Sequence, residues 1–151
     1  MPGYFFDSSA LVKFYHAESG TATVDKIVRP AGNVVRIARL TVAEMTSAFA
    51  IKVRTRSISR SEADTCLLQF LRDVVAARFG VYSVGDSEFA MAEWLIGRYA
   101  FDFRLRTLDA IQLAVALELR HQGLIDHFVV ADSNLCEVAQ LEGLSVMNPE
   151  L

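Results

Sequence analysis

The chain has 151 residues, of which 52% are apolar and 22% carry a charge. This composition predicts one globular domain spanning residues 1–151 with a sizeable core, and it excludes a disordered or low-complexity protein. The longest nearly apolar run, residues 110–117, is far too short to cross a bilayer, and the N-terminus lacks the basic start and long apolar run of a signal peptide. We therefore expect a cytoplasmic protein that does not enter a membrane.

The formal net charge of −3 conceals an uneven distribution of charge. From Arg29 to Arg60 the chain has seven bases and one acid, Glu44, whereas the remainder has 8 bases and 17 acids. A basic segment on an acidic body suits the binding of a polyanion such as nucleic acid. A solvated helix face with a basic last turn explains the same residues without a ligand, and both interpretations remain open.

The two cysteines, Cys66 and Cys136, lie far apart in the sequence and have no metal-binding spacing. Such cysteines are expected to be buried free thiols in a reducing compartment rather than a disulfide or a zinc site. The three histidines also lack ligand spacing, and surface or helix-end positions account for them: His16, His121 and His127.

Hydrophobic periodicity predicts strands that alternate with helices along the whole chain. Strands are expected at residues 4–6, 34–40, 80–84, 128–131 and 144–147. Helices are expected at residues 8–15, 41–55, 86–99, 108–121 and 135–141, with a short one from Gly20-Thr21 to Pro30 and a longer one from about 59 to 79. The alternation predicts an α/β fold with a mostly parallel sheet.

Several helices have recognisable starts and apolar faces. Thr41 and Glu44 have the spacing of a capping box, and Thr107 has the character of an N-cap. The helix at 108–121 is apolar nearly all round and should be central. Two other helices each have an apolar side, formed by Val42, Met45, Phe49 and Val53 and by Leu67, Leu68, Leu71, Val74 and Val75. In the helix at 86–99, Phe89, Trp94 and Leu95 are expected to pack inward.

Four acids occupy equivalent places in this pattern. Asp7 and Asp132 each follow an apolar strand, and Glu44 and Asp109 each lie in the first turn of a helix. In a parallel sheet all these positions fall on one edge, so the four carboxylates can gather in one cleft. Clustered carboxylates repel one another unless a cation lies among them, and oxygen-only ligands favour Mg²⁺ or Mn²⁺. Such a centre can activate water for attack on a phosphodiester.

Each acid also has a purely structural explanation. Asp7 and Asp132 can cap the helices that follow them, Glu44 can complete a capping box, and Asp109 can favour the helix dipole at the second helical position. The sequence has no P-loop, dinucleotide-binding glycine turn, nucleophile elbow or zinc-protease motif, so those chemistries lack support.

With these residues in view, the chain resembles the PIN-domain ribonucleases of the VapC toxin type over almost its whole length. The resemblance is carried by the ordered segments 6–15 (Phe-Asp-Ser-Ser-Ala-Leu-Val-Lys-Phe-Tyr), 105–114 (Leu-Arg-Thr-Leu-Asp-Ala-Ile-Gln-Leu-Ala) and 128–135 (Phe-Val-Val-Ala-Asp-Ser-Asn-Leu). Glu142-Gly-Leu144 and Asn148-Pro149 follow in the same order. The segment from Thr41 to Glu44 is the weakest part of the match.

The resemblance implies a three-layer α/β/α fold and cleavage of RNA at a Mg²⁺- or Mn²⁺-dependent acidic site. By position, Asp7 and Asp109 would be the principal metal ligands, with Glu44 and Asp132 completing the catalytic quartet. Ser8 and Thr107 resemble the small hydroxyl residues that flank the acids in the family, and the resemblance implies that they hold the acids by hydrogen bonds. Ser133 departs from the family, in which a basic residue is common at this place, and this puts local RNA contacts in doubt.

The family resemblance also implies partners. Family members form homodimers and are inhibited by a small VapB-like antitoxin, and the expected interfaces are the helix at 41–55 and the stripe from Leu67 to Val75. Three alternatives remain: an inactive PIN domain that binds RNA or a protein, a PIN nuclease of RNA processing or DNA flaps, and a phospho-acceptor receiver domain. The receiver domain needs a lysine at the end of a late strand, and no lysine follows Arg120.

Overall fold

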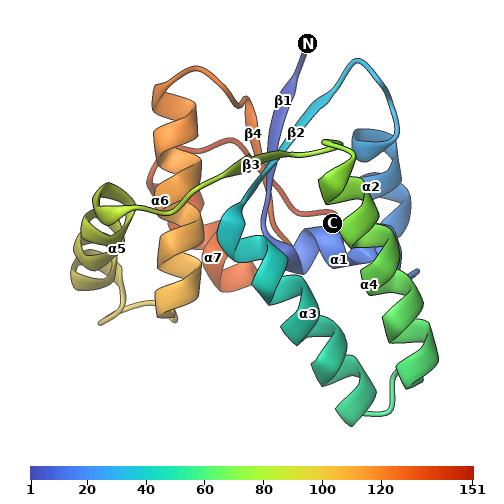
Figure 1. The fold of residues 1–151 in the computed structure, drawn as a ribbon. Coiled ribbons are helices and arrows are strands. Elements are labelled where there is room, and N and C mark those ends of the chain that lie inside the picture. Colours follow the sequence, from blue (N-terminus) through green and yellow to red (C-terminus); the bar gives the residue numbers. More distant parts are fainter.

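The computed structural model describes residues 1–151 as five strands and seven helices (Figure 1). The strands are β1 (Gly3–Phe6), β2 (Val34–Ala38), β3 (Gly80–Tyr82), β4 (His127–Val129) and β5 (Val146–Met147). The helices are α1 (Ser8–Tyr15), α2 (Thr21–Val28), α3 (Arg39–Arg54), α4 (Arg60–Val75), α5 (Asp86–Tyr99), α6 (Thr107–His121) and α7 (Ser133–Leu141).

All five strands are parallel and form one sheet in the order β3-β2-β1-β4-β5. The central strand, β1, pairs with β2 on one side and with β4 on the other, so Phe6 is opposite Ile37 and Val129. The chain extends the sheet from β1 first in one direction and later in the other. In such sheets the crevice at the carboxyl ends of the strands, beside the point of reversal, is the usual ligand site.

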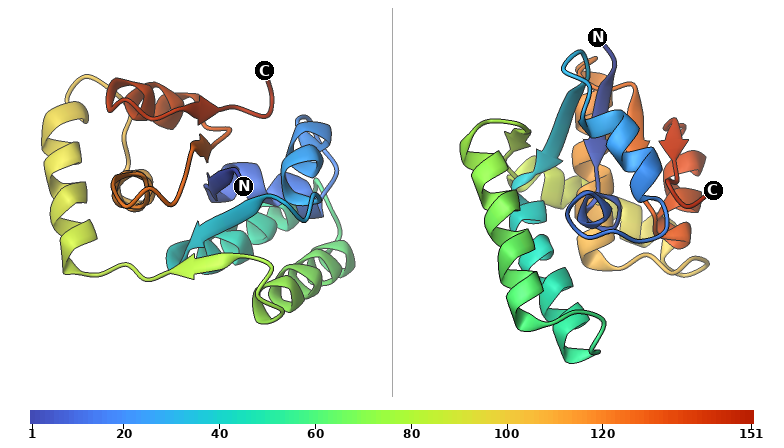
Figure 2. Two further views of the ribbon diagram at one scale, coloured as in Figure 1. Left: turned by 90° about the horizontal axis from the view of Figure 1, so that it is seen from above. Right: turned by 90° about the vertical axis from the view of Figure 1, so that its right-hand side faces the viewer.

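Helices cover both faces of the sheet, which gives three layers (Figure 2). One buried cluster joins α5, α6 and α7 to the sheet, and the other joins α1, α2, α3 and α4 to its opposite face. Neighbouring strand residues alternate between the clusters, as the pleat requires: Phe5 and Phe128 belong to the first, Phe6 and Val129 to the second. The expected α/β/α architecture with a parallel sheet is confirmed.

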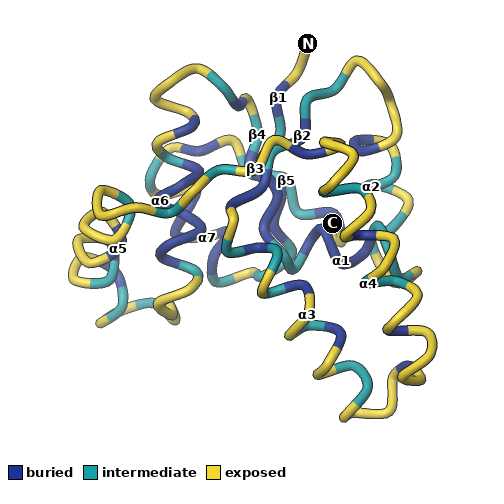
Figure 3. Tube along the Cα trace, in the orientation of Figure 1, coloured by how far each residue is buried: buried dark blue, intermediate teal, exposed yellow.

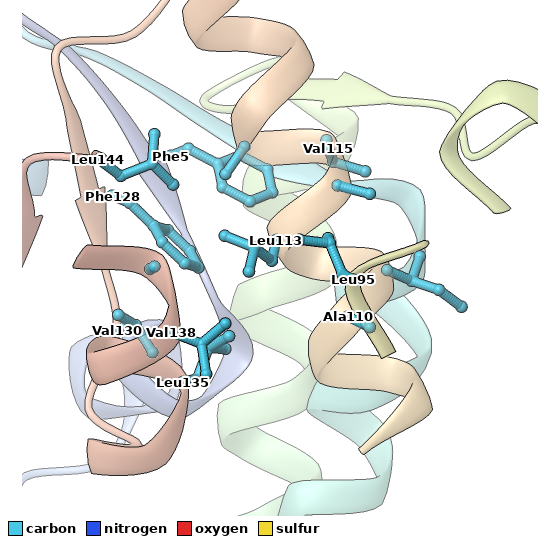
Figure 4. Packing of buried hydrophobic residues seen from close by; sticks show 14 of the residues in the cluster. Phe5, Leu95, Ala110, Leu113, Val115, Phe128, Val130, Leu135, Val138 and Leu144 are labelled. Atoms are coloured by element: carbon cyan, nitrogen blue, oxygen red, sulfur yellow. The ribbon is translucent and has the colours of Figure 1, made fainter. Parts of the chain in front are cut away.

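Helix α6 is the central helix of its layer. Its residues from Ala110 to Ala116 are all buried, and Leu113 packs beside Phe5 and Phe128 (Figure 4). Figure 3 shows that buried positions gather on the strands and on α6, whereas much of α4 and α5 is exposed. The apolar character of α6 on all sides therefore predicted its burial correctly.

Some element boundaries and apolar faces were predicted wrongly. The second strand ends at Ala38, and α3 begins at Arg39, because the chain turns into helix before the alternating pattern ends. Helix α4 ends at Val75 instead of near residue 79. Phe89 and Trp94 of α5, which were expected to pack inward, are exposed. On α4, three residues of the predicted apolar stripe are exposed as well: Leu68, Leu71 and Val75.

Helices α3 and α4 run side by side and extend beyond the carboxyl edge of the sheet (Figure 1). A true capping box starts α4, where Ser59 and Glu62 exchange hydrogen bonds of 3.1 and 2.7 Å between side chain and backbone. None of the seven helices has the length and apolar character that crossing a membrane requires.

Candidate active site

The four acids predicted from the sequence line one pocket at the carboxyl edge of the sheet. The pocket has a volume of about 140 Å³ and is lined by Asp7, Ser8, Ser9, Val12, Glu44, Ala48, Arg106, Asp109 and Asp132. Its acids come from the loops after β1 and β4, from the second turn of α3 and from the first turn of α6. The topology therefore brings together residues that are far apart in the chain.

Asp7 lies at the floor of the pocket, with only 4% of its surface exposed. It caps α1: its Oδ2 accepts hydrogen bonds from the Ser9 amide at 3.1 Å and the Ser9 hydroxyl at 2.6 Å. The pKa of Asp7 is raised from 3.8 to about 6, chiefly by burial and also by the nearby Asp109 carboxylate, although the bonds from Ser9 oppose the rise. Negative charge at Asp7 is therefore unfavourable without a cation.

Ser9 is the hydroxyl residue that holds the site together. Besides donating to Asp7, its Oγ accepts a 3.0 Å hydrogen bond from the amide of Ala131, the residue before Asp132. The loops after β1 and β4 are thus fixed to each other through one side chain. Ser8 and Thr107 were expected to hold the acids, but neither side chain makes a hydrogen bond in the structure. That expectation was wrong because the side chain that bends back to Asp7 comes from the second residue after it.

Glu44 enters the pocket from α3. Because α3 begins at Arg39 with Ala38 as its N-cap, Glu44 lies beyond the first turn, and the predicted capping box with Thr41 does not exist. Its Oε1 instead accepts a 2.5 Å hydrogen bond from Nε2 of Gln112. Burial, followed by the negative charge of Asp7, raises the pKa of Glu44 from 4.5 to about 7. A capping box therefore does not explain the presence of Glu44.

Asp109 occupies the third position of α6, since the helix begins at Thr107 and Arg106 is its N-cap. Its Oδ2 accepts from the backbone amide of Arg106 at 3.4 Å and from Nε of the same residue at 3.5 Å. Burial and the charge of Asp132 raise the pKa of Asp109, while Arg106 lowers it. The expected place at the second helical position was wrong by one residue.

Asp132 caps α7 through Oδ1, which accepts a 2.9 Å hydrogen bond from the amide of Leu135. The capping explanation is therefore correct for Asp7 and Asp132, but it occupies only one oxygen of each. Glu44 and Asp109 likewise use only one oxygen each. The free oxygens are Oδ1 of Asp7, Oδ1 of Asp109, Oε2 of Glu44 and Oδ2 of Asp132, which have no hydrogen-bond partner within the protein. Four carboxylate oxygens are thus left for a ligand.

The donor set is composed of oxygen atoms only, which suits a hard cation such as Mg²⁺ or Mn²⁺. Burial and, to a smaller extent, the neighbouring acids raise the pKa values of Asp7, Glu44 and Asp109, so their charged forms are unfavourable there without a cation. No three of the chain's Asp, Glu, His and Cys side chains converge closely enough to hold a metal ion together in this conformation. Mg²⁺ is commonly bound through one or two carboxylates while keeping several waters, so the pocket fits such an ion.

The sequence did not predict a role in the site for three residues: Ser9, Arg106 and Gln112. Gln112 carried a signal, because it is the one polar side chain in the apolar run 110–117. Arg106 is the only base that lines the acidic pocket, and nothing in the sequence distinguished it from the neighbouring Arg104.

Six of the seven bases in the basic segment fall into two environments, and the seventh, Arg36, donates a hydrogen bond to the Tyr82 hydroxyl. Arg29, Lys52 and Arg60 pair with carboxylates, of which the 2.7 Å contact between Lys52 and Glu18 is the shortest. Arg39, Arg54 and Arg56 are exposed without such partners. Arg39 begins α3 and Arg54 ends it, so the exposed bases flank the helix that carries Glu44.

Two larger depressions lie along α3, and both are mainly apolar. One, of about 280 Å³, separates α3 from α4 and includes Phe49, Val53 and Leu67. The other, of about 580 Å³, is bounded by α3, α5 and α6 and includes Phe89 and Ile111. Neither contains a cluster of acids or nucleophiles.

No protein-family model and no curated protein matches the chain. Solved structures do match it over nearly their full length. FitAcB from Neisseria gonorrhoeae aligns with a TM-score of 0.65 at 14% identity, covering 97% of both chains. A toxin-antitoxin complex from Klebsiella pneumoniae gives 0.60 at 17% identity, again with 97% of each chain covered. VapBC2 from Rickettsia felis, bound to a DNA fragment from their promoter, gives 0.61 at 12% identity, with coverage of 97% and 98%. The chain therefore shares their fold.

Proposed function

We propose that the chain is a PIN-domain endoribonuclease of the VapC type, the toxin of a toxin–antitoxin module, which hydrolyses RNA phosphodiester bonds with Mg²⁺ or Mn²⁺. The observation that carries this proposal is the gathering of Asp7, Glu44, Asp109 and Asp132 around one pocket at the reversal point of a parallel sheet. Similarity of fold to a toxin-antitoxin complex from Klebsiella pneumoniae supports the assignment of the class.

Asp7 and Asp109 would hold the cation through their unpaired Oδ1 atoms. Glu44 and Asp132 would complete the shell directly or through water. When bound, the ion neutralises charge on the phosphodiester and lowers the pKa of the attacking water. The protein's part is to fix the carboxylates: Ser9 holds Asp7 at 2.6 Å, and the α7 cap holds Asp132 at 2.9 Å.

A polyanionic substrate such as RNA is supported by exposed bases at the ends of α3 and at the pocket. Arg39 and Arg54 mark the two ends of α3, and Arg106 lies at the pocket itself. Phosphate contacts of this kind supply affinity without sequence selection. Their position would lead a polyanion across Glu44 and into the site, while the cation offsets the repulsion between phosphate and carboxylates.

Partners are proposed from the exposed apolar surfaces. The groove between α3 and α4 and the outward side chains of α4, Leu68 and Leu71, are suited to a VapB-like antitoxin. The exposed Phe89 and Trp94 of α5 are suited to a homodimer contact. A nuclease of RNA processing would have the same pocket. The identity of the neighbouring gene distinguishes a toxin from such a nuclease.

The decisive test is cleavage of labelled total RNA by purified protein that mass spectrometry shows to be free of antitoxin. Discrete products are expected with Mg²⁺ or Mn²⁺ and none with EDTA. An Asp7→Asn/Asp109→Asn variant, folded by circular dichroism, serves as the matched control and should be inactive. Absence of cleavage by the folded wild-type protein would support an inactive module that binds RNA or protein.

A further inference from the structure

Gln112 is a wholly buried polar side chain next to the acidic pocket. It lies on α6 one turn after Asp109, with buried aliphatic neighbours on either side. Its Nε2 donates two hydrogen bonds, one to Oγ1 of Thr41 at 2.8 Å and one to Oε1 of Glu44 at 2.5 Å. Both partners belong to α3, so this amide is a direct polar link between the helices that carry Asp109 and Glu44.

The carbonyl oxygen of the same amide lacks a hydrogen bond. Oε1 of Gln112 is buried and has no hydrogen-bond partner. An unpaired buried carbonyl oxygen is unfavourable, and an aliphatic side chain at this place would avoid it. The stability of the core therefore gives no reason for glutamine here, whereas the contact with Glu44 does.

The contact determines how Glu44 can be used. Because Oε1 of Glu44 is held by the amide, Oε2 is left as its free oxygen, and the carboxylate cannot rotate without breaking a 2.5 Å hydrogen bond. Fixing one oxygen of a carboxylate from behind is how residues outside the ligand set orient metal ligands. Thr41, also fully buried, accepts a hydrogen bond from the same amide and does not line the acidic pocket.

We infer that Gln112 is a positioning residue that orients Glu44 toward a divalent cation in the acidic pocket. The inference rests on the proposed metal site and adds to it a residue outside the four acids. Helix α6 then contributes in two ways: it carries the ligand Asp109, and through Gln112 it orients the ligand Glu44 on α3.

The test is the affinity for Mn²⁺, measured by the paramagnetic resonance signal of the free ion, in the wild-type protein and in matched variants. Gln112→Met keeps the length of the side chain and removes the donor, and it should weaken Mn²⁺ binding by about tenfold or more. Thr41→Val removes the other partner of the amide, and its Mn²⁺ affinity should stay close to that of the wild type. If both variants lose affinity equally, Gln112 acts by general packing and the inference is overturned.

A double-mutant cycle with Glu44→Gln supplies the second criterion. If Gln112 acts through Glu44, Gln112→Met should cause no further loss of Mn²⁺ affinity in the Glu44→Gln background. A full additional loss there overturns the inference while leaving the metal site intact. If the wild-type protein binds no Mn²⁺, or if Asp7→Asn/Asp109→Asn does not weaken binding, the proposed function itself fails and the inference fails with it.

A measurement without metal tests the geometry directly. The side-chain amide protons of Gln112, assigned by their loss in Gln112→Met, should exchange slowly with solvent and shift in Glu44→Gln. Rapid exchange, or resonances insensitive to Glu44→Gln, would show that the link between α6 and α3 does not persist in solution and would overturn the inference.

Discussion

The hydroxyl of Ser9 donates a 2.6 Å hydrogen bond to Oδ2 of Asp7 and so occupies one oxygen of the most deeply buried acid in the pocket. The same hydroxyl accepts from the amide of Ala131, which precedes Asp132. Two of the four acids are therefore positioned by one small side chain that belongs to neither strand. This arrangement leads to the first prediction.

Ser9→Ala should destabilise the protein at neutral pH by about 1.5–3 kcal/mol, because it removes a hydrogen bond to a charged, buried carboxylate. The pKa of Asp7 should rise above its present value of about 6, since the Ser9 bonds now lower it. Urea unfolding without metal measures the stability. Ser8→Ala is the control and should change it by less than about 0.5 kcal/mol, since the Ser8 hydroxyl makes no hydrogen bond. Equal effects of the two substitutions would contradict the role given to Ser9.

The stability of the metal-free protein should contain a component that falls as the pH rises. The pKa of Asp7 is raised from 3.8 to about 6 and that of Glu44 from 4.5 to about 7, so both carboxyls bind protons more tightly in the folded state. Their contribution is fully present below the unfolded pKa values and is lost as the pH rises through the folded ones.

Asp7→Asn isolates this component because asparagine does not titrate. In EDTA at about pH 8, the variant should be more stable than the wild type by on the order of 2–3 kcal/mol, and the difference should vanish near pH 4. Unfolding by urea across this range provides the comparison. A difference of constant size at every pH would show that Asp7 is not destabilised by its charge.

Divalent cations should offset the repulsion between the carboxylates and so stabilise the folded state. A cation present at about 100 times its Kd adds about 2.7 kcal/mol, which corresponds to a rise in Tm of about 5–10 °C for a chain of this size. Thermal unfolding with Mg²⁺, with Mn²⁺ and with matched sodium chloride measures the effect. Asp7→Asn/Asp109→Asn should show no cation-dependent rise, and a rise as large as that of the wild type would place the cation elsewhere.

A prediction on the fold concerns Gly20, whose φ of 91° lies in the left-handed region. A Cβ there would also come within 2.9 Å of the carbonyl oxygen of Pro149, so the C-terminal segment would have to move. Gly20→Ala should cost about 1–3 kcal/mol in urea unfolding. Gly97 is the matched control, because it lies inside α5 with open space around it, and Gly97→Ala should stabilise by about 0.5–1 kcal/mol. The reverse order would contradict the packing of the C-terminal segment.

The helices predicted best from the sequence are those whose start signals agree with their place in the fold. Helices α1 and α5 have the predicted boundaries, because a strand end or a glycine turn precedes each of them. The burial of α6 followed from its apolar character on all sides. The start of α3 was wrong because Thr41 and Glu44 have the spacing of a capping box while the chain enters the helix two residues earlier.

The side chains that support the acids were harder to predict. The convergence of the four acids on one pocket followed from the carboxyl edge of a parallel sheet, which needs only strand and helix positions. The roles of Ser9 and Gln112 depend on rotamers and on which helices approach each other. The outward direction of Phe89 and Trp94 likewise depends on how α5 rotates against α6, which periodicity alone does not determine.

Anomalous diffraction from crystals soaked in Mn²⁺ can show whether these carboxylates form one divalent metal centre. We expect an anomalous peak in the pocket within coordination distance of Asp7 and Asp109, absent from Asp7→Asn/Asp109→Asn crystals treated in the same way. A well-ordered pocket without a peak at saturating Mn²⁺, or a peak bound only elsewhere on the chain, would contradict this expectation.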